Sequence, residues 1–143
     1  MIVNNDMEIK LYYRFIEFTS KMLGVDLPHE RFKLLVLDNF KAESKTELNV
    51  KRFAESYLYL INNTNQSLTT TIIKKAYYLL TDKMLEEEKC KKILEEFYMH
   101  FDETSHYLAA LIHFKVLDNV EERKIEFAFM LSNLVMLKNI SAP

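Results

Sequence analysis

The chain has 143 residues, 49% apolar and 28% charged, and its 19 Lys and Arg against 21 Asp and Glu leave a formal net charge of −2. These proportions exclude an intrinsically disordered chain and a nucleic-acid-binding protein that works by bulk electrostatic attraction. One glycine, Gly24, and two prolines, Pro28 and Pro143, leave little backbone suited to positive φ, which excludes most phosphate-binding loops.

The spacing of apolar residues predicts a first helix that begins after a cap at Asn5 or Asp6 and ends at Gly24, since glycine readily takes the left-handed conformation that closes helices. This helix has two apolar faces, so we expect it to be sandwiched in the fold or to contact a second subunit. The first face comprises Ile9, Tyr12, Tyr13, Ile16 and Leu23. The second comprises Phe15, Phe18 and Met22.

Capping signals and apolar repeats predict three further helices in the middle of the chain. Pro28 suits the first turn of a second helix, whose inward residues would be Phe32, Leu35, Val36 and Phe40. Ser44 and Glu47 have the spacing of a capping box, so a third helix is expected to run from there to about Ile61. The polar segment 62–67 separates it from a fourth, whose apolar period is Leu68, Ile72, Ile73, Ala76, Tyr77 and Leu80.

Three more helices complete the prediction. Thr81 or Asp82 would cap the fifth, Asp102 or Thr104 the sixth, and Asn119 with Glu122 would form a capping box for the seventh. The apolar residues of the fifth helix are Leu85, Ile93, Leu94, Phe97 and Phe101. Those of the sixth are Leu108, Leu111, Ile112 and Val116. Those of the seventh are Ile125, Ala128, Phe129, Leu131, Leu134 and Val135. No alternating strand pattern occurs, so we predict one all-α domain, a bundle of six to seven helices over 1–143.

The histidines are weak candidates for a metal site. Glu103 and His106 have the Glu-x-x-His spacing of di-iron bundles, with His100, Asp102 and His113 nearby, but that site needs a second such pair and the chain has none. We therefore expect surface or hydrogen-bonded histidines, with His29 in a first helical turn. The sequence assigns no metal and no cofactor.

Nucleophilic catalysis has equally little support. Cys90 lies between Lys89 and Lys91, in a charged stretch typical of a solvated helix face, so we interpret it as a free, inert thiol. Adjacent acids such as Glu95 and Glu96 diverge on a helix and do not form a general acid and base pair. The tyrosines are interpreted as amphipathic core edges. The methionines are interpreted as core filler: Met7, Met22, Met84, Met99, Met130 and Met136.

A single cysteine forbids an internal disulfide and fits a reducing compartment. The first residues lack a basic start followed by an apolar run, and the most apolar segment, Phe127 to Leu137, is broken by Ser132 and Asn133. We therefore expect a cytoplasmic protein without a signal peptide or a membrane span.

The second part of the chain, from about residue 46 to 143, resembles the Fic domain, an all-helical fold best known for transferring AMP from ATP to protein hydroxyl groups. Four segments carry the resemblance: ELNVKRFAESYLYLI, SLTTTIIKKAYYLLTDK, YLAALIHFKV and FMLSNLVMLKNISAP. The resemblance implies a Fic-like core over 46–143 that follows an N-terminal helical pair over 1–45.

The departures from that family concern its active site. Where Fic domains have His-Pro-Phe-x-x-Gly-Asn-Gly-Arg, this chain has Leu-Asp-Asn-Val-Glu-Glu-Arg-Lys at 117–124, without the catalytic histidine and both glycines. Glu121 and Glu122 would place carboxylates where an anionic phosphate should bind. The family's β-hairpin flap would fall after Leu80, where we expect only Thr81 to Lys83 before the next helix, too few residues for a hairpin.

Three hypotheses follow. The favoured one is a non-catalytic Fic-like helical protein that binds another protein or itself, with no catalytic residues. The second is a diverged nucleotide-transferring enzyme in which Arg123, Lys124 or His113 contacts a phosphate. The third is an unrelated helical bundle, such as a bacterial or phage accessory protein. A homo-oligomer is suggested separately by the apolar surplus of residues 9–23 and 125–137.

Overall fold

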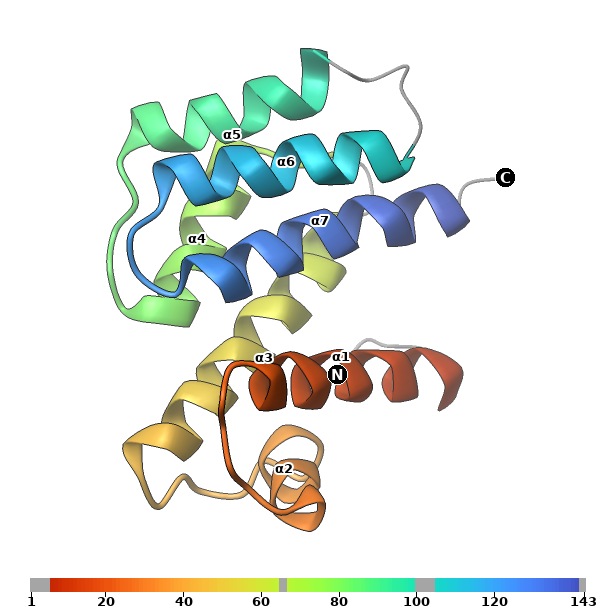
Figure 1. Cartoon of the computed structure of the whole chain (residues 1–143), viewed down its shortest axis with the longest axis vertical. Helices are drawn as coiled ribbons and strands as arrows, with labels where there is room; N and C mark the ends of the chain where they lie inside the picture. Colours follow the sequence, from red (N-terminus) through yellow and green to blue (C-terminus); the bar gives the residue numbers. More distant parts are fainter. Residues whose placement is uncertain (1–5, 65–66, 100–104, 142–143) are drawn as a thin grey trace.

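The computed structural model describes residues 6–64, 67–99 and 105–141, and these residues form seven α-helices without a strand. The prediction of an all-α bundle of six to seven helices is confirmed. The helices are α1 (Asp6–Met22), α2 (His29–Val36), α3 (Lys45–Asn63), α4 (Thr70–Thr81), α5 (Glu87–Met99), α6 (Ser105–Asn119) and α7 (Lys124–Ser141). In Figure 1, α5, α6 and α7 lie together at one end, α1 and α2 at the other, and α3 with α4 connects the two.

The end of α1 follows the sequence prediction. Gly24 has a φ of +93°, and its N–H donates to Lys21 O at 3.0 Å. The next amide, that of Val25, donates to Ser20 O at 3.0 Å. This pair of bonds is the Schellman closure that a glycine after a helix permits.

The second helix is shorter than predicted. Pro28 is its N-cap, and the helix ends at Val36, so Phe40 falls outside it and is 48% exposed. The expected inward position of Phe40 is therefore wrong. Leu37 is the C-cap, Asn39 two residues later takes a φ of +52°, and the Phe40 N–H bonds back to Leu34 O at 3.1 Å, so the chain turns back over the end of this helix without the paired bonds that close α1.

The predicted capping residue of α3 is confirmed, although the box is only half formed. Ser44 Oγ accepts a hydrogen bond from the Glu47 N–H at 3.1 Å. Glu47 does not reciprocate to Ser44; its carboxylate accepts from the Glu43 N–H at 2.9 Å and binds Arg31. The helix runs two residues beyond the expected end at Ile61.

Two predicted caps are wrong because the residues close the preceding helix. Thr81 is the last residue of α4, and Asp82, with a φ of +63°, is its C-cap and donates its N–H to Tyr78 O at 2.8 Å. Asn119 is the last residue of α6, where its side-chain amide donates to Lys115 O at 2.8 Å. Asp and Asn tolerate helix ends as well as helix starts, and the tertiary contacts choose between them. The caps expected for α1 at Asn5 and for α6 at Asp102 or Thr104 lie outside the described residues, apart from Asp6, which begins α1.

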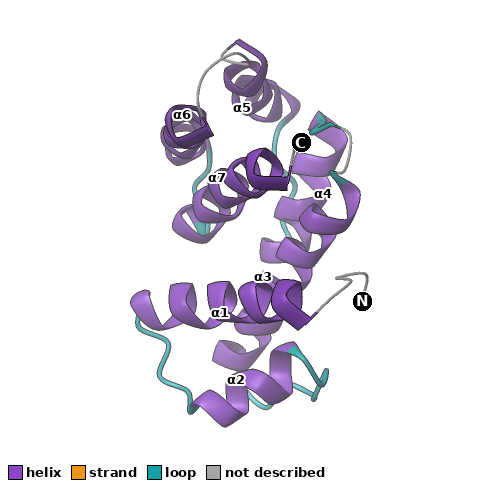
Figure 2. Cartoon of the chain, turned by 90° about the vertical axis from the view of Figure 1, so that its right-hand side faces the viewer, coloured by secondary structure: helices purple, strands orange, loops and turns teal. Residues whose placement is uncertain are grey.

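All seven helices contribute to one apolar core, in which α3 is central. Its residues Val50, Phe53, Tyr57 and Leu60 are almost completely buried. Helix α3 packs against α1 and α2 on one side and against α4 and α7 on the other, while α6 packs between α5 and α7. The turned view again shows α5, α6 and α7 at one end of the molecule and α1 with α2 at the other (Figure 2).

The methionine prediction is wrong for four of the six residues named. Met130 is buried and Met136 packs against the core. Met7, Met22, Met84 and Met99 are instead half or more exposed. Since methionine fits surfaces as easily as interiors, helical spacing alone does not place it. Within the described part of the chain, no helix combines the length and the apolar character that crossing a bilayer requires.

Candidate functional site

The link between α6 and α7, residues 120–123, is the place where the sequence resemblance puts an active site. Val120 is buried, and the exposed Glu121 and Glu122 follow it. Arg123 then takes a φ of +49° directly before α7 begins. The link is therefore a tight turn of four residues and not an extended loop.

Two side chains fasten this link to α4. The Tyr77 hydroxyl donates to Glu122 O at 3.1 Å and accepts from the Glu122 N–H at 3.2 Å. The Arg123 guanidinium donates to Leu80 O at 3.1 Å and to the Glu126 carboxylate at 2.6 Å. Burial raises the pKa of Tyr77, so its hydroxyl stays protonated and can donate one of these hydrogen bonds while it accepts the other. The backbone amide at Glu122 is thus used internally.

A shallow cleft of about 320 Å³ lies beside the link. It is lined by Tyr77, Lys83, Met84, Leu85, Glu86, Lys89, Glu121 and Glu122. Three carboxylates against two ammonium groups make a poor phosphate site, because phosphate needs convergent cations or unspent amides. The joint from α4 to α5 that forms its other wall is five residues long, Asp82 to Glu86, longer than expected, and it forms no hairpin.

The residues of the nucleotide-transfer hypothesis are not brought together around an open phosphate position. Arg123 is bound to Leu80 O and Glu126 as above. His113 stacks on Phe129 with ring centroids 5.2 Å apart and lies edge-on to Phe114. Lys124 is exposed at the start of α7. The arginine is thus engaged in internal hydrogen bonds and the histidine in ring packing.

The other histidines form no metal centre among the residues that the structure describes, where no group of three or more His, Cys, Asp and Glu could hold an ion. His106 is exposed near the start of α6. His100, Asp102 and Glu103 lie outside the described residues.

Cys90 is completely buried on the inner side of α5, so the expectation that its surroundings are solvated is wrong at this position. The thiol is unpaired, as predicted. Burial raises its pKa to about 11. The thiolate is the reactive form of cysteine, so burial favours the less reactive protonated thiol at neutral pH.

Sequence reasoning missed a cluster in which Tyr13, Glu17 and His29 join α1 to α2. The Tyr13 hydroxyl lies 3.0 Å from His29 Nδ1, and Glu17 Oε1 lies 2.9 Å from the same nitrogen. Burial opposes ionisation of Glu17, but hydrogen bonds from Lys21, Tyr13 and His29 outweigh it and lower its pKa. A catalytic relay uses the two ring nitrogens separately, whereas here both partners meet one nitrogen, so the cluster fastens two helices.

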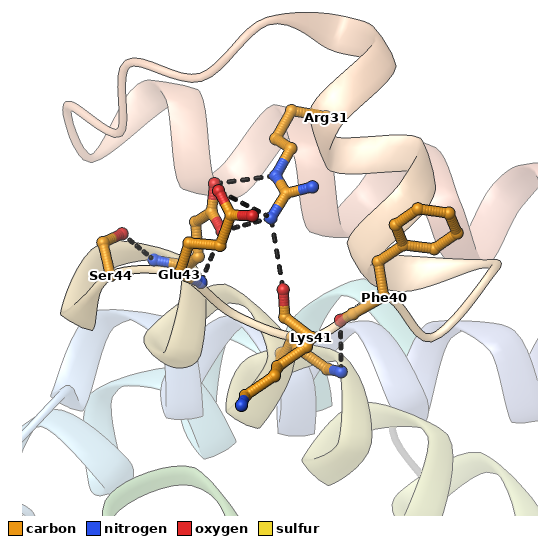
Figure 3. Close-up of polar contacts among 7 residues, drawn as sticks. Arg31, Phe40, Lys41, Glu43 and Ser44 are labelled. Carbon is orange, nitrogen blue, oxygen red and sulfur yellow. Dashed lines mark hydrogen bonds and ion pairs between the residues drawn. The ribbon is translucent and has the colours of Figure 1, made fainter.

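A second missed cluster joins Arg31 of α2 to Glu47 at the start of α3. Its guanidinium donates to both carboxylate oxygens of Glu47, at 2.8 and 2.7 Å, and to Lys41 O at 3.2 Å (Figure 3). The hydrogen bonds from Arg31, followed by that from the Glu43 N–H, lower the pKa of Glu47 to about 2. Lys51 Nζ donates to Phe40 O at 2.6 Å. This cluster holds the α2–α3 loop, and residue spacing gave no signal for it because the partners lie 16 residues apart.

The outer face of α1 differs from all these clusters because its large side chains contact little else. Met7, Leu11, Phe18 and Met22 are 66%, 51%, 71% and 50% exposed. They recur at intervals of four, seven and four residues, so they form one straight ridge along the helix. We call these four residues the α1 ridge. The predicted second apolar face of this helix is thus partly confirmed, since Phe18 and Met22 are exposed while Phe15 packs on Phe53 and Tyr57.

Neither a known protein family nor a curated protein sequence matches this chain. Without a matching relative, a functional assignment depends on the structure, and two regions bear on it: the α1 ridge and the α6–α7 link. The link is closed by internal bonds. The ridge is exposed to solvent.

Proposed function

We propose that this chain is a non-catalytic helical protein that acts by binding another protein through the α1 ridge. The observation that carries the proposal is the alignment of four large apolar side chains, each at least half exposed, on one helix face. Soluble proteins rarely leave such a contiguous apolar patch without using it. Complete burial of one such side chain is worth about 1.5–3 kcal/mol. The four side chains are 50–71% exposed, so burying what remains of them gives somewhat more than half of that value each and offsets part of the rigid-body entropy that association costs, about 4–15 kcal/mol.

The chemistry of the α6–α7 link supports the non-catalytic part of the proposal. The cleft beside it exposes Glu121 and Glu122, and Arg123 is engaged with α4. We include in the proposal that residues 46–143 are a degenerate Fic-like core, on the sequence segments quoted above. Protein binding through α1 does not depend on that relationship, because α1 lies outside the Fic-like segment.

Calorimetric titration with Mg·ATP tests the absence of nucleotide chemistry. We expect no saturable heat up to millimolar nucleotide, since carboxylates at the link repel a triphosphate. Saturable binding that Arg123→Ala weakens would instead support the diverged transferase. Arg14→Ala, a substitution of an exposed arginine far from the link, is the matched control.

Site-specific photocrosslinking tests the binding function directly. A photoreactive residue at position 18 is expected to capture another polypeptide in the cells that natively produce the chain. The same group at exposed Lys92 on α5 should not. Equal capture at both positions, or capture at 18 that survives Leu11→Asp, would contradict the proposal.

A further inference from the structure

We propose that the surface which covers the α1 ridge is an acidic amphipathic helix of a different protein. This inference rests on the protein-binding function proposed above and adds the chemistry of the partner. Two features of α1 carry it: the shape of the ridge and the charges along its border.

The ridge has the shape that a second helix fits. From Met7 to Met22 it extends about 22 Å along α1, at 1.5 Å per residue. Its intervals of four and seven residues are those of a helix that packs ridge into groove against another. The opposite face of α1 is occupied by the buried Tyr12, Tyr13 and Ile16, so the helix cannot turn its ridge inward. A partner helix of about four turns would cover the ridge from end to end.

The border of the ridge nearest α2 carries two basic side chains, Lys10 and Arg14, in addition to the acidic Glu17. Lys10 and Arg14 lie there, one turn apart, on the same side of α1 as Glu17, which contacts His29 of α2. Both are exposed, and within residues 6–64, 67–99 and 105–141 neither side chain takes part in a hydrogen bond or ion pair. Lys21, further along, is bound to Glu17 at 3.1 Å. Two cations without a direct partner beside an apolar ridge favour a binding partner with carboxylates at the matching positions.

The same border disfavours a second copy of this chain. A symmetric antiparallel pair of α1 helices would place the Lys10 and Arg14 border against itself, and like charges at that distance repel. A parallel pair would bring this border against the opposite one, where α1 itself has a single carboxylate, Glu8, for two cations.

A membrane surface is also disfavoured. Helices that lie on anionic bilayers carry a basic polar face. The six charged residues of α1 instead cancel: Asp6, Glu8 and Glu17 against Lys10, Arg14 and Lys21. An acidic partner helix fits the ridge better than an anionic membrane does, because it requires basic residues only at the border formed by Lys10 and Arg14.

The test uses the full chain and two labelled synthetic peptides of about five turns, followed by fluorescence anisotropy. Both peptides carry leucine at the apolar positions of a helix; one has Glu and the other Lys at the flanking positions. We expect the Glu peptide to bind saturably and about tenfold more tightly than the Lys peptide, as two exposed ion pairs allow. Added salt should narrow this gap.

Three variants of the chain locate the site. Phe18→Asp should abolish binding of the Glu peptide, whereas Phe114→Asp, at a similarly exposed phenylalanine on α6, should leave it unchanged. The double variant Lys10→Glu with Arg14→Glu should reverse the preference toward the Lys peptide. All three change exposed side chains, and unchanged melting by circular dichroism verifies that each is folded.

The following results would overturn the inference. Equal binding of both peptides, or binding that survives Phe18→Asp, would exclude an acidic helix on this ridge. Sedimentation with phosphatidylserine vesicles that Phe18→Asp abolishes would identify a membrane surface. A dimer in light scattering that Phe18→Asp dissociates would identify a second copy. If neither peptide binds while crosslinking at position 18 still captures a protein, the partner's chemistry is wrong but the proposed function stands.

Discussion

The α1 ridge and the α6–α7 link differ in how much of their chemistry the fold itself consumes. At the link, the Tyr77 hydroxyl and the Arg123 guanidinium both donate hydrogen bonds to backbone carbonyls of the same chain. On the ridge, side chains as large as Phe18 remain mostly exposed, and the neighbouring Lys10 and Arg14 side chains have no hydrogen-bond or ion-pair partner in the described part of the chain. A region whose groups are already used cannot offer them to a ligand. The comparison therefore favours the ridge over the link as the binding surface that we propose, although the resemblance to Fic domains directs attention to the link.

The largest expected contrast comes from removing one phenylalanine in each region. Phe127 is completely buried behind the link, edge-on to Tyr77 at 5.2 Å. Phe127→Ala should lower the free energy of unfolding by about 3–5 kcal/mol, because it leaves a cavity. Phe18→Ala should change it by less than about 0.5 kcal/mol. Urea unfolding measures both, and similar losses would mean that the ridge is part of the core.

Arginine substitutions give the next contrast. Arg123→Ala removes the bonds to Leu80 O and Glu126 and should cost about 2 kcal/mol. Arg123→Gly loses the same bonds but suits the φ of +49°, so it should be about 1 kcal/mol more stable than the alanine variant. Arg14→Ala on α1 should leave thermal stability unchanged. If glycine and alanine at position 123 are equally stable, the left-handed backbone there is not a source of strain.

Tyr77→Phe isolates the hydroxyl that holds the link. It should lower the free energy of unfolding by about 1 kcal/mol and speed hydrogen exchange at the Glu122 amide, which loses its acceptor. Tyr78→Phe, at an exposed neighbour, serves as the control. Unchanged exchange at Glu122 in the Tyr77 variant would show that the link closes without this bond.

Acid should loosen the end of the molecule under α1 before it affects the link, and this is the smallest effect we expect. The pKa of Glu47 is lowered from 4.5 to about 2, so its contribution to stability is present above pH 4.5 and is lost as the pH falls from 4.5 toward 2. Glu17, with its lowered pKa, acts in the same direction. Hydrogen exchange should therefore rise first in α2 and the start of α3.

The variant Glu47→Gln provides the control for that experiment. It should weaken the α2–α3 loop at neutral pH and remove most of its acid dependence, because the group that titrates is gone. An acid dependence in α2 that persists in this variant and disappears in Glu17→Gln would assign the effect to the contact with His29 instead.

Local signals in the sequence were sufficient for helix type and for several helix ends. Gly24 closes α1 and Ser44 caps α3 as predicted, because each acts through backbone groups within six residues. Asp82 and Asn119 were assigned to the wrong helix, since the same side chains serve either a start or an end. The order and kind of elements thus followed from the chain, but not every boundary.

The sequence by itself determined an all-helical fold, because a 3.6-residue apolar period is a property of each segment alone. Which of two apolar faces is covered is a property of contacts between segments. Only the tertiary structure decided that Cys90 of α5 is buried in the core, that Arg31 bonds to Glu47, and that Phe18 is exposed to solvent. Those outcomes depend on how helices pack across long separations in the chain, and a single sequence carries no direct record of that packing.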